Sequence, residues 1–206
     1  MDKAKNVEEY IARQREAIAA NPECGNSHYN LAIGLIGLKQ YEEAEKELHT
    51  AIENSPTLAE AYVQLGGIRL KDGDLDGCLH YNKMAVKARP GFSEGYGNIG
   101  FVHLQRGEYD EAIKALTRAT AFNFRFIQGF VTLANAYLMK GMPDESIEAS
   151  KKALELEPEF AVAHNNIGIA YLEKGEMSLA RKHIEKAQAL GYEVAPEILK
   201  EVASEG

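Results

Sequence analysis

Tryptophan is absent from this sequence of 206 residues, and cysteine and proline are scarce, with two and six residues. The two cysteines, Cys24 and Cys78, can form neither a disulfide framework nor a metal-ligand pair at short spacing. With so little proline and 45% hydrophobic residues, the chain is neither a low-complexity nor a disordered one. We therefore expect an ordinary folded protein of a reducing compartment.

Long apolar runs are also missing. The longest uninterrupted run spans residues 31–38, whereas a helix that crosses a membrane needs roughly 18 apolar residues or more. The first twenty residues mix acidic and basic side chains instead of forming the apolar stretch of a secretory signal. We expect a soluble, cytoplasmic protein without membrane insertion.

Positive charge is in deficit, because 23 Lys and Arg stand against 31 Asp and Glu, for a formal net charge of −8. None of the 34-residue blocks described below exceeds a net charge of +1. Proteins that hold nucleic-acid phosphates need clustered Lys and Arg. We therefore expect no nucleic-acid partner.

The dominant feature of the sequence is a period of 34 residues. Pro22, Pro56, Pro90 and Pro158 keep this spacing, and Phe124 occupies the position that is skipped. One alanine recurs at the same interval without a miss, as Ala17, Ala51, Ala85, Ala119, Ala153 and Ala187. Such periodicity is typical of stacked repeat proteins.

Counted from Gly25, five consecutive blocks share small and aliphatic residues at fixed positions. Small residues allow two helix backbones to approach closely, and aliphatic neighbours fill the seam between them. The seventh position holds Leu31, Leu65, Ile99, Leu133 and Ile167, the eighth holds Ala32, Gly66, Gly100, Ala134 and Gly168, and the twentieth holds Ala44, Cys78, Ala112, Ser146 and Ala180. Each block is expected to form a hairpin of two helices.

A break is predicted between the two helices of each hairpin. A left-handed glycine is expected to end the first helix in four blocks, at Gly73, Gly107, Gly141 and Gly175. The first block has Lys39 there, and we expect a somewhat different turn because a non-glycine residue adopts that conformation at a cost. The second helices are expected to begin at Tyr41, Leu75, Tyr109, Pro143 and Met177.

This pattern resembles the tetratricopeptide repeat, which has two antiparallel helices in 34 residues. Aromatic or His residues stand where the family often has Trp or Tyr early in the repeat, at His28, Tyr62, Tyr96, Phe130 and His164. The resemblance covers nearly the whole chain. It implies an all-α fold, a right-handed superhelical solenoid of antiparallel helix pairs.

The register divides the chain into seven segments. We predict an N-terminal capping helix in residues 1–24, five repeats in 25–58, 59–92, 93–126, 127–160 and 161–194, and a C-terminal capping helix in 195–206. Residues 7–20 look like the second helix of a truncated repeat, with Asn6 and Glu9 as a capping pair. After Pro196, an apolar face is expected from Val194, Ile198, Leu199 and Val202.

Motifs that carry catalysis are missing from the sequence: there is no phosphate-binding loop, no nucleophile elbow and no zinc-protease motif. We expect no enzyme, no cofactor and no metal site. His28 and His164 are interpreted as packing substitutes for aromatic residues. Cys78 is interpreted as a buried inert thiol, and Cys24 as unreactive because no cation stands beside it to lower its pKa.

The first helices of tetratricopeptide proteins line the concave groove, and the sixth residue of each block carries an amide or a hydroxyl. Amide side chains can accept from a peptide N–H and donate to its C=O, so that a row of them can hold an extended backbone. The row resembles the asparagine ladder of O-linked N-acetylglucosamine transferases, although Gln64 and Thr132 interrupt it. The alternative is that Asn recurs here in generic consensus repeats.

The fifth and ninth residues flank this row and add an apolar strip. The predicted groove residues are Tyr29, Asn30, Ile33, Val63, Gln64, Gly67, Gly97, Asn98, Phe101, Val131, Thr132, Asn135, Asn165, Asn166 and Ile169. The chaperone-tail variant of the family grips a C-terminal carboxylate with Lys, Arg and Asn, whereas Tyr29, Ile33, Gln64, Glu94 and Asn98 stand at the corresponding places. Chaperone tails are therefore not expected as partners.

We expect a non-enzymatic scaffold that binds a peptide segment or helix of a protein partner in this groove. Two alternatives stay open, a self-assembling homo-oligomer and a regulatory or assembly subunit of an enzyme complex. The helix of Tyr29 lacks a preceding first helix, which would expose a strip to a second copy.

The segment that connects the third and fourth blocks is rich in phenylalanine. Phe122 is expected in the core because Leu156 and Leu190 hold its equivalent positions. Phe124 and Phe126 either mark a partner or self-association patch, or fold into the seam between blocks, which is the preferred interpretation.

Overall fold

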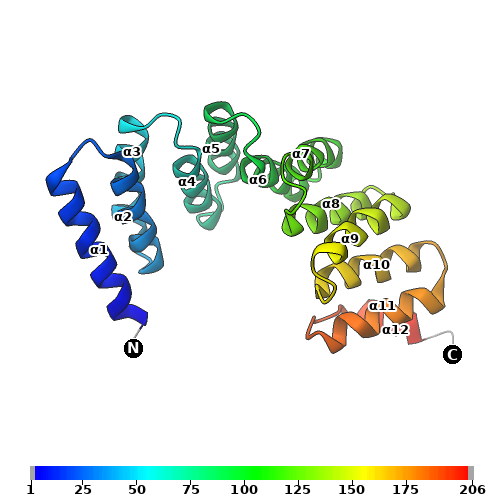
Figure 1. Cartoon of the computed structure of the whole chain (residues 1–206). Helices are drawn as coiled ribbons and strands as arrows, with labels where there is room; N and C mark the ends of the chain where they lie inside the picture. Colours follow the sequence, from blue (N-terminus) through cyan, green and yellow to red (C-terminus); the bar gives the residue numbers. More distant parts are fainter. Residues whose placement is uncertain (1–2, 204–206) are drawn as a thin grey trace. The chain divides into compact units, whose positions relative to one another are not determined.

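The structure is a computed structural model that describes residues 3–203. Residues 1–2 and 204–206, the outer ends of the two predicted capping segments, lie outside the described residues. The described chain is all-helical and contains twelve α-helices and no strand (Figure 1). The helices are α1 (Lys3–Ala20), α2 (Gly25–Gly37), α3 (Tyr41–Asn54), α4 (Ala59–Lys71), α5 (Leu75–Ala88), α6 (Ser93–Gln105), α7 (Tyr109–Phe122), α8 (Ile127–Met139), α9 (Pro143–Leu156), α10 (Ala161–Glu173), α11 (Met177–Ala189) and α12 (Pro196–Ala203).

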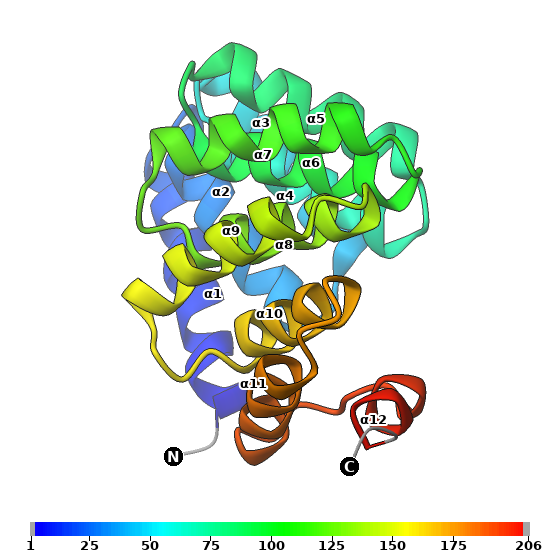
Figure 2. The ribbon, with the colours of Figure 1, turned by 90° about the vertical axis from the view of Figure 1, so that its right-hand side faces the viewer.

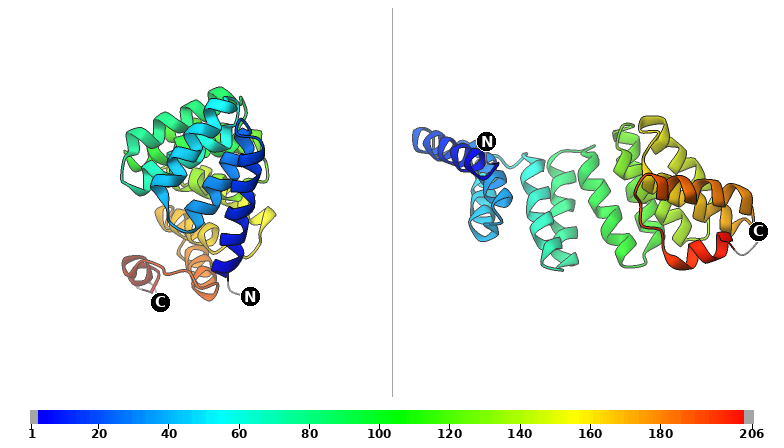
Figure 3. Two further views of the ribbon diagram at one scale, coloured as in Figure 1. Left: turned by 90° about the vertical axis from the view of Figure 1, so that its left-hand side faces the viewer. Right: turned by 90° about the horizontal axis from the view of Figure 1, so that it is seen from below.

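The chain divides into two compact units, an N-terminal unit of Met1–Ile99 and a C-terminal unit of Gly100–Gly206. In the N-terminal unit α1 lies along α2, and the pairs α2/α3 and α4/α5 each form an antiparallel hairpin (Figures 1 and 3). In the C-terminal unit the hairpins α8/α9 and α10/α11 pack on each other in succession (Figure 2). Tandem helix hairpins are thus the building block of both units.

The second helices begin at the predicted residues in all five hairpins. The four predicted glycines end the preceding helices with φ between 71° and 78°, and Lys39 adopts the same left-handed conformation with φ 61°. The Gln40 N–H donates to the Leu35 carbonyl at 2.9 Å, just as the Asp74 N–H donates to the Arg69 carbonyl at 2.9 Å. The expectation of a different turn at Lys39 is therefore wrong.

The small residue at the eighth position is the contact on which each hairpin depends. A Cβ atom added at three of the glycines would overlap a side chain of the second helix, at Gly66 with Asn82, at Gly100 with Leu116 and at Gly168 with Ile184. Each of these side chains comes sixteen residues later and fills the space that glycine leaves open. The alanines that recur every 34 residues near the ends of the second helices, from Ala51 to Ala187, are 0% exposed.

The N-terminal helix is longer than predicted. It begins at Lys3 instead of residue 7, so that Asn6 lies inside the helix and does not cap it. Ala17 keeps the 34-residue register but is exposed, since none of the helices in residues 3–203 covers this face of α1. Ile11, at 6% exposure, contacts the core of the first hairpin instead.

The C-terminal end closes differently from the other helix pairs. Gly191 follows α11 with φ 85°, and the Tyr192 N–H donates to the Ala187 carbonyl at 3.0 Å. The short helix α12 then lies beside α11 (Figure 2), where Arg181 donates to the Val202 carbonyl at 2.9 and 2.6 Å. Val194, Ile198, Leu199 and Val202 pack on the core of the last hairpin, as predicted.

The phenylalanine segment is more exposed than predicted. Phe122, the last residue of α7, is 55% exposed, so its placement in the core is wrong. Phe124 is 75% exposed, and the seam interpretation is wrong for it. Phe126 is half-buried over Gly129, where a Cβ atom would overlap its ring.

Among the described residues, no helix combines the length and the apolar character that a bilayer-spanning helix requires.

The left-handed Lys39 allows a stability test. Lys39→Gly is expected to raise the free energy of unfolding by about 0.5–1 kcal/mol, because glycine adopts a positive φ without a steric penalty. Gly73→Lys, at the same register of the next hairpin, should lower it by about 1 kcal/mol. Urea unfolding measures both. A stabilised Gly73→Lys variant would contradict this explanation of the turn.

Candidate functional site

A cavity of about 630 Å³ opens along the first helices of the C-terminal unit. Its walls come from the end of α6, from α8 and α10, and from residues 192–198 around the start of α12. All seven groove residues predicted for this unit line the cavity, namely Phe101, Val131, Thr132, Asn135, Asn165, Asn166 and Ile169. The 34-residue register brings them together because it repeats the same helix face.

The lining of this cavity, called the groove below, is apolar and amide-rich. Besides the predicted residues it contains Leu104, Gln105, Gln128, Val162, Tyr192, Glu193, Val194, Ala195, Pro196 and Ile198. Glu193 is the one charged residue among them, and the lining holds no Lys, Arg or His. Such a lining suits a largely uncharged ligand that offers both apolar side chains and hydrogen-bonding groups.

The polar residues of the groove have two different roles. The Asn166 amide donates to the Val131 carbonyl of α8 at 3.2 Å, and the Thr132 hydroxyl donates to the Gln128 carbonyl at 2.8 Å. These two groups thus support the groove. The side-chain amides of Asn135 and Asn165 make no hydrogen bond to any described residue. Asn135 is exposed, whereas Asn165 lines the cavity with 6% of its surface exposed.

The predicted residues of the N-terminal unit lie on its first helices but line no such groove together. Tyr29, Asn30 and Ile33 are on α2, Val63, Gln64 and Gly67 on α4, and Gly97 and Asn98 on α6. Ile33 lines a separate cleft of about 440 Å³ between α1 and α2, beside Val7 and Tyr10. Burial raises the pKa of Tyr29, and the carboxylates of Glu60 and Glu94 raise it further.

Asn98 is tied into the helix seam. Its side-chain amide donates to the Asn82 side-chain oxygen at 3.0 Å, and Asn82, which is 0% exposed, donates to the Cys78 carbonyl at 2.9 Å. Cys78 is 2% exposed, as expected for an inert packing thiol. Three other second helices hold Leu48, Leu116 or Ile184 at the position of Asn82, and the fourth holds Ser150. The hydrogen-bonded pair of Asn82 and Asn98 thus replaces aliphatic packing at this point.

Sequence reasoning missed the wall formed by residues 192–198, including Glu193. The signal that could have revealed it is Gly191 followed by Tyr192 at the place where other blocks hold Pro. Glycine at φ 85° redirects the chain after α11, and the redirected segment closes one side of the groove.

The histidines at the aromatic position of their repeats, the buried His28 and the partly buried His164, also make polar contacts. The His28 Nδ1 lies 2.6 Å from the Glu47 Oε2 and its Nε2 lies 2.9 Å from the Pro22 carbonyl. His164 repeats the arrangement, with its Nε2 3.2 Å from the Pro158 carbonyl and its Nδ1 3.1 Å from the Nδ1 of His183. The interpretation as simple aromatic substitutes is therefore incomplete, because both rings link the end of one helix pair to the next.

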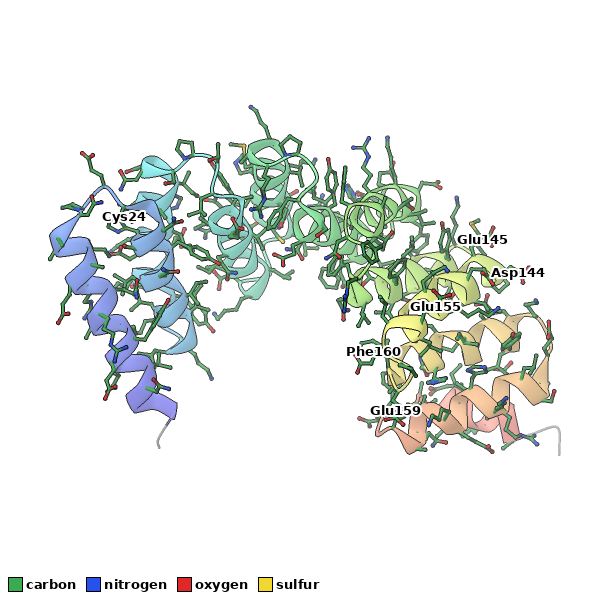
Figure 4. The ribbon with its side chains drawn as sticks, viewed as in Figure 1. Cys24, Asp144, Glu145, Glu155, Glu159 and Phe160 are labelled. Atoms are coloured by element: carbon green, nitrogen blue, oxygen red, sulfur yellow. The ribbon has the colours of Figure 1, made fainter. Side chains whose placement is uncertain are left out.

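His183 and Cys24 also have pKa values that their surroundings shift. Burial lowers the pKa of His183 to about 4, with further contributions from the nearby His164, Lys182 and Lys151. The pKa of Cys24, which precedes α2 (Figure 4), is lowered by the Ser27 hydroxyl and by the backbone N–H groups of Ser27 and Asn26. The sequence search for a neighbouring cation missed these donors, because they arise from the helix N-terminus.

Among residues 3–203 no cluster of three or more His, Cys, Asp or Glu side chains has an arrangement that could hold a metal ion. Asp144 and Glu145 lie in the first turn of α9, where negative charge favours the helix N-terminus (Figure 4).

Comparison with protein-family models finds tetratricopeptide repeats in the second half of the chain. One model, described as TPR repeat, matches residues 134–175, and a second, described as tetratricopeptide repeat, matches residues 93–125 and 161–190. No curated protein sequence matches the chain. The family is generally a non-catalytic interaction module.

Several solved structures share the fold. The crystal structure of MamA is similar with a TM-score of 0.70 and 25% identity over 84% of this chain and 98% of that one. YrrB, titled "a TPR protein with an unusual peptide-binding site", is similar with a TM-score of 0.69 and 22% identity over 86% and 91%. PilF of Pseudomonas aeruginosa has a TM-score of 0.76 and 19% identity over 87% and 82%.

The depressed pKa of His183 predicts an acid-sensitive stability. The unfolded chain takes up a proton near the usual pKa of 6.5 and the folded chain only near 4, so stability is lost as the pH falls from 6.5 to 4. His183→Phe should reduce this loss by about 1 kcal/mol, a value discounted because the ring is only half-buried. Urea unfolding at pH 7.0 and 4.5 measures it. An unchanged pH dependence would contradict the assignment.

Proposed function

Because the chain is a tetratricopeptide repeat protein, we propose that it is a non-catalytic scaffold whose C-terminal unit binds a peptide segment of a protein partner in the groove. The observation that carries the proposal is the cavity of about 630 Å³ lined by all seven predicted residues of this unit. The groove is lined by residues of the successive first helices α6, α8 and α10. A site that extends over several repeats suits an extended segment of a partner chain.

Two free amides support binding of the peptide backbone. Asn135 and Asn165 lie on adjacent first helices and both line the groove. Each amide can accept one hydrogen bond and donate another, which matches the N–H and C=O groups of an extended segment. The apolar residues around them, such as Phe101 and Ile169, would contact the side chains of that segment.

The charge of the groove lining favours a basic ligand over an acidic one. Without a Lys, Arg or His in its lining, the groove offers no cation to a C-terminal carboxylate. This favours the earlier expectation that chaperone tails are not partners. Glu193 would instead attract a Lys or Arg of the bound segment.

YrrB, a structural relative, is titled as having an unusual peptide-binding site, and we propose the same class of ligand for this chain. The division into five repeats with two capping helices and the cytoplasmic location remain predictions.

Peptides selected from a random display library on the whole chain test the groove. Asn135→Ala combined with Asn165→Ala should weaken their affinity about tenfold, since each lost backbone contact is worth roughly 0.5–1.5 kcal/mol. Fluorescence anisotropy with labelled peptides measures the change, and thermal unfolding verifies that stability is kept.

Asn166→Ala is the matched control for this experiment. Its amide supports α8 through the Val131 carbonyl, so its loss should lower the free energy of unfolding by about 1 kcal/mol. If the selected peptides bind the Asn135/Asn165 variant and Phe101→Glu as tightly as the natural chain, the groove is not the binding site.

Glu193 gives a separate prediction about specificity. Glu193→Gln should weaken the binding of Lys-containing selected peptides by about threefold to tenfold, because a partly shielded ion pair is lost. The same peptides with Lys replaced by norleucine should bind both proteins equally. Isothermal titration calorimetry of the four combinations isolates the pair. An equal loss for both peptides would show that Glu193 acts only on the shape of the wall.

A further inference from the structure

A second depression lies on the α8/α9 hairpin of the C-terminal unit, apart from the groove. Its volume is about 360 Å³, and its floor is formed by Phe130, Leu133, Tyr137 and Ala149. Phe130, Leu133 and Tyr137 are spaced by three and four residues and therefore share one face of α8. The groove residues Val131 and Asn135 lie on a different face of this helix. We call this depression the hollow.

The hollow exists because Ala149 is small. The equivalent position holds a large side chain beside the aromatic or His residue of the first helix in three other hairpins, namely Glu47 with His28, Tyr81 with Tyr62 and His183 with His164, whereas the α6/α7 hairpin holds Ala115 there. Ala149 cannot reach across to Phe130, and the space remains open. An open apolar depression on a packed surface is typical of a binding site for a bulky side chain.

The rim of the hollow is acidic. Asp144, Glu145, Glu148 and Lys152 line it. Asp144 is paired with Lys174 at 2.7 Å and Glu148 with Lys151 at 3.0 Å, so Glu145 is the carboxylate of the rim that is left for a partner. Figure 4 shows Asp144 and Glu145 together at the first turn of α9. Glu145 is exposed and forms no ion pair with any residue of the described chain. The rim therefore favours an apolar group that is accompanied by a positive charge.

The chain itself presents such a group at the corner between α7 and α8. Phe124 is 75% exposed and stands where other blocks hold Pro, and Phe122 beside it is 55% exposed. The next residue, Arg125, is exposed and, within residues 3–203, takes part in no ion pair. A bulky aromatic ring next to an unpaired cation matches an apolar hollow with an unpaired carboxylate.

We propose that the chain forms a two-fold dimer in which Phe124 of each copy occupies the hollow of the other, with Arg125 facing Glu145. The corner and the hollow belong to neighbouring segments, since Phe124 precedes the hollow residue Phe130 by six positions. One two-fold axis can thus form both contacts at once, as a self-complementary interface requires. With two aromatic anchors, association is expected to be weak and reversible, with a dissociation constant of about 0.1 mM.

Sedimentation velocity of the full chain between about 10 µM and 1 mM tests the proposal. The natural chain should shift from monomer to dimer. Phe124→Pro restores the residue of the other corners, and Ala149→Tyr fills the hollow with the residue of α5. Each variant should weaken dimerisation at least about tenfold.

Mixing the two variants provides the decisive measurement. Ala149→Tyr still carries Phe124, and Phe124→Pro still carries an open hollow, so an equimolar mixture should regain one of the two contacts and associate more strongly than either variant alone. Circular dichroism verifies that both variants are folded. If Ala149→Tyr fails to fold, Glu145→Arg takes its place and should weaken dimerisation, which Arg125→Glu on the same chain should restore.

Three outcomes would overturn the proposal. The natural chain could stay monomeric at 1 mM, which would leave the hollow to a foreign ligand. Phe124→Pro could dimerise like the natural chain, which would place the contact elsewhere. The mixture of folded variants could stay as weakly associated as its components, which would show that Phe124 and the hollow do not meet.

Discussion

The close approach of the two helices in each hairpin is the contact on which the rest of the structure depends. A side chain of the second helix enters the space left by Gly66, Gly100 or Gly168, and a Cβ atom there would overlap it. Tight packing of this kind stabilises the hairpin and also determines which faces of its helices remain outside. The packing between the two helices of each hairpin therefore determines which surfaces are available for binding.

In the C-terminal unit this constraint arranges the groove. Since α8 and α10 are the first helices of successive hairpins, the same helix face repeats, and Asn135 and Asn165 both line one cavity. The Asn166 amide then links α10 to the Val131 carbonyl. Some polar residues of the first helices thus hold the scaffold together, and others are left for a ligand.

Departures from the repeated pattern explain the individual features of the molecule. Gly191 redirects the chain after α11 and adds Glu193 to the groove. Ala149 leaves a depression where three other hairpins hold a larger residue. Phe124, in place of Pro, leaves a ring in solvent. In a repeat protein such exceptions are informative, because every position has internal equivalents for comparison.

The sequence by itself determined the all-helical hairpins, the starts of the second helices and the inward position of the small residues, because helical periodicity and a 34-residue repeat are local properties of the chain. It also placed the seven groove residues of the C-terminal unit on one surface. Only the tertiary structure decided which side-chain amides lack a hydrogen bond within the protein. Asn98 donates to Asn82 and Asn166 donates to the Val131 carbonyl, and the 34-residue pattern does not predict these partners. Three other features likewise depend on which side chains of neighbouring helices pack together: the exposure of Phe122, the lowered pKa of His183 and the hollow at Ala149.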